Sequence, residues 1–194
     1  MKRNLIFGSL ALAGLAAFVA CNTSDVTSPD MTSASTGLSI YLTDAPIDFK
    51  GVSAVNVGLT SVTLYPSDGG ENVVLGPING GYVINLLEFQ NGHTTLLARK
   101  VVPDGSYNKI RIEIARAQIV YDDDMNPDTP DVTAEIMVPS DKVDLNVEFD
   151  VRQEEDMSIT LDFDAQNSVQ VNQTNGKNEF ILRPVITVVE VHQG

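Results

Sequence analysis

The sequence predicts an all-β protein, an antiparallel β-sandwich of about eight or nine short strands with at most one short helix. Apolar and polar residues alternate along most segments after residue 36, as in Met157–Phe163 (M-S-I-T-L-D-F). A period of two places successive side chains on opposite faces of a strand. Turn signals such as Asp-Gly and Asn-Gly separate these segments. Helical periodicity is almost absent, so strands must build the core.

The first 36 residues predict export and membrane anchoring. Lys2 and Arg3 precede the apolar run Leu5–Val19, which is too short to span a bilayer comfortably and is typical of a signal peptide. Phe18-Val19-Ala20-Cys21 resembles the bacterial lipobox, in which the cysteine is lipidated. We therefore expect a signal peptide over 1–20, a lipidated Cys21 with a flexible tether over 21–36, and one domain over 37–194. An ordinary secretory peptide with an incidental cysteine is the alternative.

Charge and cysteine content narrow the function classes. Without its predicted leader the chain carries 10 basic and 26 acidic residues, a net charge of −16. Such a field repels phosphate backbones, which argues against nucleic-acid binding. A single cysteine excludes an intrachain disulfide, so stability must come from the core. The expected location is the outer membrane, on its periplasmic or cell-surface side, and the oligomeric state is left open.

The sequence predicts that the first half of the domain consists of strands separated by prolines and turns. Gly37–Thr43 alternates and stops at Asp44-Ala45-Pro46, because proline lacks a backbone donor. In the segment that ends at Pro66, the apolar residues over 55–64 stand at odd positions before Thr60-Ser61 and at even positions after it. This change predicts one long strand with a bulge near Thr60-Ser61. A turn over 67–70 and a short strand over 73–75 follow. Tyr82–Phe89 favours a short helix or an irregular cap over a strand.

The second half continues the pattern. Strands are expected over 94–102, 107–114, 132–138 and 143–151, over the start of 157–169, and over 180–191. Pro184 marks a bulge or an edge position in the last of these. A hairpin through Arg152–Asp156 would place Asp144 opposite Asp164, which is destabilising unless a cation or basic side chains compensate. We favour basic side chains, and the expected polar network comprises Asp44, Asp144, Asp162, Asp164, Arg111 and Arg183, with Lys109 as a further candidate.

The acidic loop 122–131 is the best candidate for a metal site. Asp122, Asp124, Asn126 and Asp128 have the spacing of the first four EF-hand ligands. Pro127 replaces the turn glycine and Thr133 the bidentate glutamate, which favours a solvated loop. A weak calcium site of another type, using Asp123 or Asp131, stays open. No other cofactor is expected.

Catalytic motifs are not recognisable in the sequence. His93 and His192 are the only histidines, and neither lies in a known nucleophile or metal motif. Asp162 and Asp164 would lie roughly 7 Å apart on one strand face, as glycosidase carboxylates do, but any amphipathic strand gives that spacing. We therefore expect a non-catalytic module that binds a glycan or a protein, through a groove with two or more exposed tyrosines. A purely structural envelope component is the rival hypothesis.

Four blocks in this order carry a family resemblance. They are Tyr41-Leu42-Thr43-Asp44-Ala45-Pro46, Pro103–Ile112 (P-D-G-S-Y-N-K-I-R-I), Leu161–Ala165 (L-D-F-D-A) with Ser168-Val169, and Leu182–Ile186 (L-R-P-V-I). Together they resemble the domain-of-unknown-function family DUF4382, found in exported bacterial and archaeal proteins and often in lipoproteins. The resemblance implies an extracytoplasmic all-β domain, reminiscent of prealbumin-like Greek-key sandwiches, and no catalytic residues.

Overall fold

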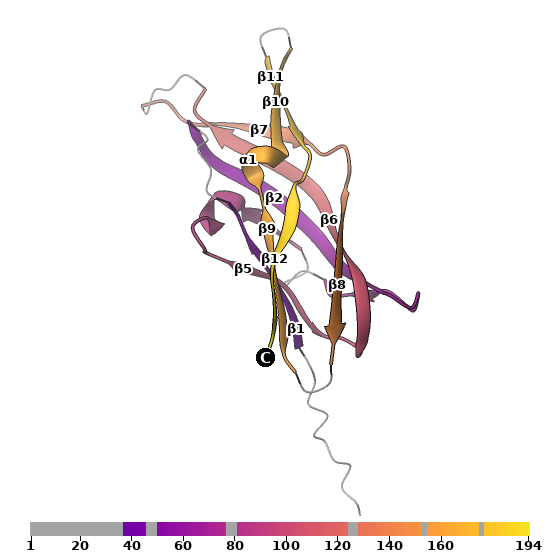
Figure 1. Ribbon diagram of the computed structural model, residues 1–194. Coiled ribbons are helices and arrows are strands. Elements are labelled where there is room, and N and C mark those ends of the chain that lie inside the picture. The colour runs from indigo at the N-terminus through magenta and orange to yellow at the C-terminus, as the bar shows by residue number, and fades with distance from the viewer. Residues whose placement is uncertain (1–36, 46–49, 77–80, 124–127, 153–154, 175–176) are drawn as a thin grey trace, which may run out of the picture. The chain divides into compact units, whose positions relative to one another are not determined.

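Two stacked sheets form the protein in the computed structural model, which confirms the all-β sandwich (Figure 1). Residues 37–45, 50–76, 81–123, 128–152, 155–174 and 177–194 are described. The strands are β1 (Gly37–Thr43), β2 (Val52–Pro66), β3 (Val73–Val74), β4 (Tyr82–Asn85), β5 (Thr95–Val101), β6 (Gly105–Tyr121), β7 (Val132–Met137), β8 (Lys142–Val151), β9 (Met157–Phe163), β10 (Val169–Thr174), β11 (Lys177–Leu182) and β12 (Ile186–Gln193). The described part also has a 3₁₀ helix, η2 (Leu86–Phe89), and one helical turn, α1 (Ala165–Ser168).

The strand order corrects the prediction of a purely antiparallel sandwich. The smaller sheet has the order β12-β9-β1-β5, and the larger one β10-β11-β7-β6-β2-β3, with β4 on β2 and β8 on β6. β1 pairs with β9 in parallel, and so does β11 with β7. More than one hundred residues separate β1 from β9, so no short turn forces them to be antiparallel. The sheets are therefore mixed, and the described residues form 12 strands rather than eight or nine.

The core lies between the sheets, and the alternating strands line it as predicted. On β9, Ile159, Leu161 and Phe163 are fully buried, whereas Ser158 and Thr160 between them are half-buried on the outer face. Ile110, Ile112 and Ile114 of β6 are buried from the opposite sheet. Burial of apolar surface at about 25 cal/mol per Å² is the main source of stability in such a core.

Of two local predictions in the first half, the bulge is confirmed, and the short helix is confirmed only for the second half of the 82–89 segment. The pairing of β2 with β6 slips between Gly58 and Ser61, which is the expected bulge in one long strand that ends at Pro66. The 82–89 segment forms β4 followed by η2, and Asn85 caps η2 by accepting a hydrogen bond from the Leu87 amide. β6 is longer than predicted, because its second half pairs with β7 and its first half with β8.

The predicted β8–β9 hairpin is wrong. β8 pairs with β6 in the larger sheet, and β9 lies between β1 and β12 in the smaller one. The chain therefore passes from one sheet to the other between Val151 and Met157. The apolar residues of both strands still face the core, but from opposite sides. Asp144 consequently does not face Asp164.

The predicted last strand over 180–191 is also wrong, because the chain changes sheets within it. β10 and β11 form a hairpin in the larger sheet, whereas β12 returns to the smaller sheet and pairs with β9. After β9 the chain therefore crosses to the larger sheet through α1 and returns to the smaller one through 183–185. Hydrogen bonds join the two crossings: the Ser168 hydroxyl accepts from the Val185 amide at 2.8 Å, and the Asp164 amide donates to the Val185 carbonyl at 3.0 Å.

The predicted signal peptide, Cys21 and the tether lie outside the described residues. Within the part of the chain that the structure describes, no helix is long and apolar enough to cross a bilayer.

Candidate functional site

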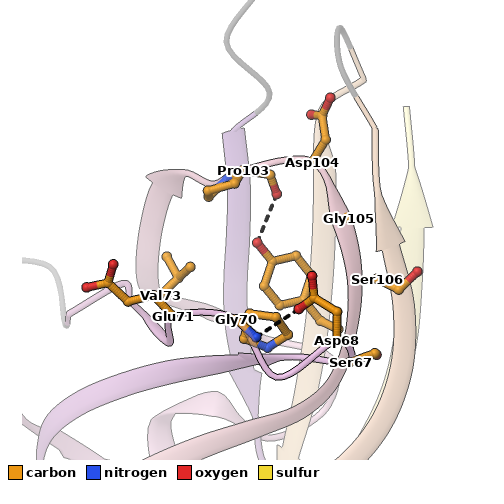
Figure 2. A pocket seen from close by; sticks show the side chains of 11 residues that line it. Ser67, Asp68, Gly70, Glu71, Val73, Pro103, Asp104, Gly105 and Ser106 are labelled. Carbon is orange, nitrogen blue, oxygen red and sulfur yellow. Dashed lines mark hydrogen bonds between the residues drawn. The ribbon is translucent and has the colours of Figure 1, made fainter.

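A pocket of about 670 Å³ lies where β2 and β6 end their pairing. Two turns form it, 66–71 with the start of β3 and 103–106, and they face each other across the opening (Figure 2). The Ser67 amide donates to the Ser106 carbonyl at 2.8 Å, which holds the first turn against the start of β6. Gly69 and Gly105 have φ of 77° and 144°, conformations that glycine adopts without steric cost. The pocket is therefore built on backbone that the sheet fixes.

The Tyr107 ring closes the floor of this pocket. It is 2% exposed, its hydroxyl donates to the Pro103 carbonyl at 2.9 Å, and it stacks on Phe149 of β8 with 5.4 Å between centroids. Burial raises the pKa of Tyr107, and the nearby Asp104 and Asp68 raise it further. The hydroxyl is thus a neutral donor already committed to Pro103, so that the ring positions the 103–106 turn.

The lining of the pocket is acidic and partly apolar. Asp68, Glu71 and Asp104 are exposed at its edge, and none of its lining residues is basic. Asp68 accepts from the Gly70 amide at 2.9 Å, whereas Glu71 and Asp104 make no side-chain hydrogen bond within the described residues. Pro66, Pro103 and Val73 contribute apolar surface. This arrangement offers hydrogen-bond acceptors to a neutral or cationic ligand.

The Asp-Gly pairs at 68–69 and 104–105 indicate both turns in the sequence, but nothing in it indicates that they lie close together. That proximity depends on the pairing of Pro66 with Tyr107, residues about forty positions apart. Alternation marks β2 and β6 as strands without specifying that they are neighbours. The bulge predicted on β2 was the only sequence feature that could have helped to find its pairing with β6.

The predicted polar network divides into two separate groups. On the larger sheet, Arg111 donates to both carboxylate oxygens of Asp144 at 2.6 and 2.8 Å, and Lys109 lies 3.5 Å from the same group. The Arg111 contact lowers the pKa of Asp144. Basic side chains therefore pair with Asp144 as expected, although the opposing aspartate is absent. Arg183 lines a shallow pocket with Asp144 without an ion pair to it.

The second group comprises Asp44, Asp162 and Asp164 beside the two sheet crossings. Asp164 caps α1 by accepting from the Asn167 amide at 2.9 Å, so it is a structural residue. Asp44 is 2% exposed and accepts from the Ala165 amide at 3.0 Å. The second oxygen of Asp44 and one oxygen of Asp162 are buried without a hydrogen-bond partner. Three of the four sequence blocks named above thus meet at one end of the smaller sheet.

Burial raises the pKa of Asp44 to about 7, and the charges of Asp162 and Asp164 add to the effect. Burial and the neighbouring Asp164 also raise the pKa of Asp162. None of the pockets described above or below is lined by these aspartates or by His93. The absence of catalysis stays a prediction.

The acidic loop is only partly described. Asp122 is half-buried, Asp123 and Asp128 are exposed, and Asp124 and Asn126 lie outside the described residues. The described residues contain no group of three or more acidic, histidine or cysteine side chains arranged to hold a metal. Calcium binding by this loop stays a prediction.

The four tyrosines whose side chains the structure describes do not form the expected groove. Tyr107 is buried, and Tyr41, Tyr65 and Tyr121 are half-buried. The Tyr65 ring lies beneath the Lys109 ammonium, 3.8 Å from its centroid, and is therefore covered. Each pocket described here contains at most one tyrosine. The acidic pocket therefore offers a ligand two prolines and the single, largely buried ring of Tyr107 rather than a groove of exposed tyrosines.

Comparison with known proteins identifies the family of this chain. The model of the family described as "Domain of unknown function (DUF4382)" matches residues 35–184, which spans β1 to β11 and both crossings. Neither the curated proteins nor the solved structures include a match. Because the matched region covers most of the chain, with three of the four sequence blocks in full and the fourth up to Pro184, this protein belongs to the DUF4382 family.

Proposed function

We propose that this protein is a lipid-anchored, exported binding module that holds a glycan in the pocket between the 66–73 and 103–107 turns. The pocket itself carries the proposal. It is about 670 Å³ in volume, within the range of small-molecule sites, and the ends of two long paired strands hold it in place. The signal peptide and lipobox-like sequence support an extracytoplasmic location, where glycans are abundant.

The lining favours a neutral or amino sugar over an acidic one. The carboxylates of Asp68, Glu71 and Asp104 accept hydrogen bonds from hydroxyl or ammonium groups. Pro66, Pro103 and Val73 offer the apolar surface that the C–H face of a sugar ring contacts. An acidic glycan is disfavoured in this pocket because its lining carries three carboxylates and no basic side chain.

Binding to a panel of neutral, amino and acidic oligosaccharides tests this function. We expect the purified protein to bind a neutral or amino glycan, and Asp104→Asn or Glu71→Gln to weaken binding roughly tenfold, since a hydrogen bond to a charged group contributes about 1.5–3 kcal/mol. Asp141→Asn, an exposed aspartate outside the pocket, is the matched control and should bind normally. Binding only to cationic peptides, or to no glycan, would overturn the proposal, as would full binding by both pocket variants.

Lipid anchoring is tested separately by replacing Cys21, the only cysteine. In a bacterium that exports the protein, we expect a labelled fatty acid to be incorporated into the wild type and not into Cys21→Ser. Covalent acyl chains hold a protein at a membrane because each buried methylene contributes about 0.8 kcal/mol. Ser24→Ala is the control and should be labelled. An unlabelled wild type whose mature chain begins elsewhere than Cys21 would show an ordinary secreted protein.

A further inference from the structure

A row of polar side chains crosses the outer face of the smaller sheet. Ser39 of β1 pairs with Arg99 of β5 on one side and with Ser158 of β9 on the other, and Ser158 pairs with His192 of β12. Directly paired residues have Cβ atoms about 4.5–5.5 Å apart. The core-facing neighbours Leu38, Ile40, Met157 and Ile159 are buried on the opposite face. The pairing therefore aligns four polar side chains from all four strands.

These four residues line a pocket of about 310 Å³, together with Tyr41 and Asp156. Ser39 is 7% exposed and lies at its base, whereas Arg99 and His192 are exposed at its sides. Gly37 leaves the space open, since a Cβ there would lie 3.3 Å from Nε and Nη2 of Arg99 and 3.2 Å from Oδ1 of Asp156. A side chain at position 37 would therefore crowd the Arg99 and Asp156 side chains that line the pocket.

Of the charged side chains in this pocket, Asp156 has a hydrogen-bond partner and Arg99 has none within the described residues. Oδ1 of Asp156 accepts a hydrogen bond from the Gly37 amide at 3.1 Å. Within the described residues, Arg99 makes neither a side-chain hydrogen bond nor an ion pair. Ser39, Ser158 and Tyr41 add hydroxyl groups, and His192 adds an imidazole. The arrangement combines an unpaired guanidinium with several neutral donors, which is the donor set that oxyanions require.

We propose that this outer-face pocket binds an oxyanion, with the Arg99 guanidinium as the charged donor and the hydroxyls of Ser39 and Ser158 as neutral donors. The group is the carboxylate of an acidic sugar or a phosphate group, and both present oxygens in the fork geometry that arginine matches. This site is separate from the acidic glycan pocket, which takes neutral or cationic ligands. It goes beyond the proposed function and does not depend on it.

Amide chemical shifts measured during titration test the site. The purified protein is titrated with inorganic phosphate, with glucuronate and with neutral glucose. We expect saturable shifts at Ser39, Ser158 and His192 with a Kd of about 1 mM for at least one anion, and none with glucose. Saturation by glucuronate alone identifies an acidic sugar as the source, and saturation by phosphate alone identifies a phosphate group.

Two arginine variants decide whether the binding belongs to this pocket. Arg99→Gln should weaken anion binding at least tenfold while leaving the melting temperature unchanged, because its side chain is exposed. Arg116→Gln, an exposed arginine on β6, should bind like the wild type. The proposal is overturned if neither anion saturates, if glucose produces the same shifts, or if the two variants lose affinity equally. The neutral and amino glycans of the panel described above carry no oxyanion and report on the other pocket, whereas binding of an acidic glycan that Arg99→Gln abolishes belongs to this one.

Discussion

Replacing Phe163 with alanine is expected to destabilise the protein by about 3–5 kcal/mol, the cost of removing a buried aromatic side chain. Phe163 is fully buried at the end of β9, where Ile186 of β12 pairs with it. This loss of stability is the sum of the transfer free energy of the ring and the free-energy cost of the cavity that remains. For a chain of this size that corresponds to a melting temperature lower by roughly 6–20 °C. Urea denaturation monitored by circular dichroism measures the free energy directly.

Met137→Ala on β7 is the matched control for this prediction. Met137 is 61% exposed, so its replacement should change the free energy of unfolding by less than about 0.5 kcal/mol. Equal effects of the two substitutions would contradict the placement of β9 at the centre of the core. An unchanged slope of free energy against urea would show that both variants unfold from the same compact state.

The inward-facing residues could be predicted from the sequence because alternation reports which face of a strand is buried. Leu145, Phe149, Leu161 and Phe163 were all expected in the core, and all four are buried. Alternation does not report which strand lies beside which. β8 and β9 satisfy it equally well as a hairpin and as strands of opposite sheets, since either arrangement buries the same side chains. Alternation therefore predicted both strands correctly, but it could not support the pairing that placed Asp144 opposite Asp164.

The sheet crossings and the pockets could not be predicted from the sequence, and the reason is the same for both. Each depends on contacts between residues far apart in the chain. Pro184 was interpreted as a bulge or an edge position within one strand, whereas the 183–185 segment is hydrogen-bonded to Ser168 and leads into another sheet. Likewise, Arg99, Ser39, Ser158 and His192 lie on four strands, and only the pairing of β5, β1, β9 and β12 aligns them.

The stability of this protein should fall as the pH rises from about 4 to about 7, because Asp44 is buried among acidic groups. Its pKa rises from 3.8 to about 7 on folding, so the folded state binds more protons than the unfolded state within that window. The free energy of unfolding then decreases with pH and levels off above about 7. Each unit of pKa difference corresponds to roughly 1.4 kcal/mol, which gives a total on the order of 2–4 kcal/mol. Asp162, whose pKa is also raised, contributes with the same sign.

Asp44→Asn isolates this contribution and should stabilise the protein at alkaline pH. The amide oxygen can still accept the hydrogen bond from the Ala165 amide, which the Asp44 carboxylate accepts at 3.0 Å. The side chain no longer ionises, so the repulsion from Asp162 and Asp164 that raises the pKa of Asp44 is removed. We expect a gain on the order of 2–4 kcal/mol at pH 8 and almost none at pH 4, where Asp44 is already protonated.

Thermal and urea unfolding between pH 4 and pH 8 compare the wild type with Asp44→Asn and with Asp141→Asn. Asp141 is exposed, so its variant should follow the wild-type curve and report the general repulsion within a chain of net charge −14. Only the difference between the Asp44→Asn and wild-type curves measures the buried carboxyl group. If the Asp44→Asn curve runs parallel to that of the wild type, Asp44 is ionised throughout and a cation or an ordered donor must neutralise it. If the curves converge at pH 4, this end of the smaller sheet holds a proton at neutral pH.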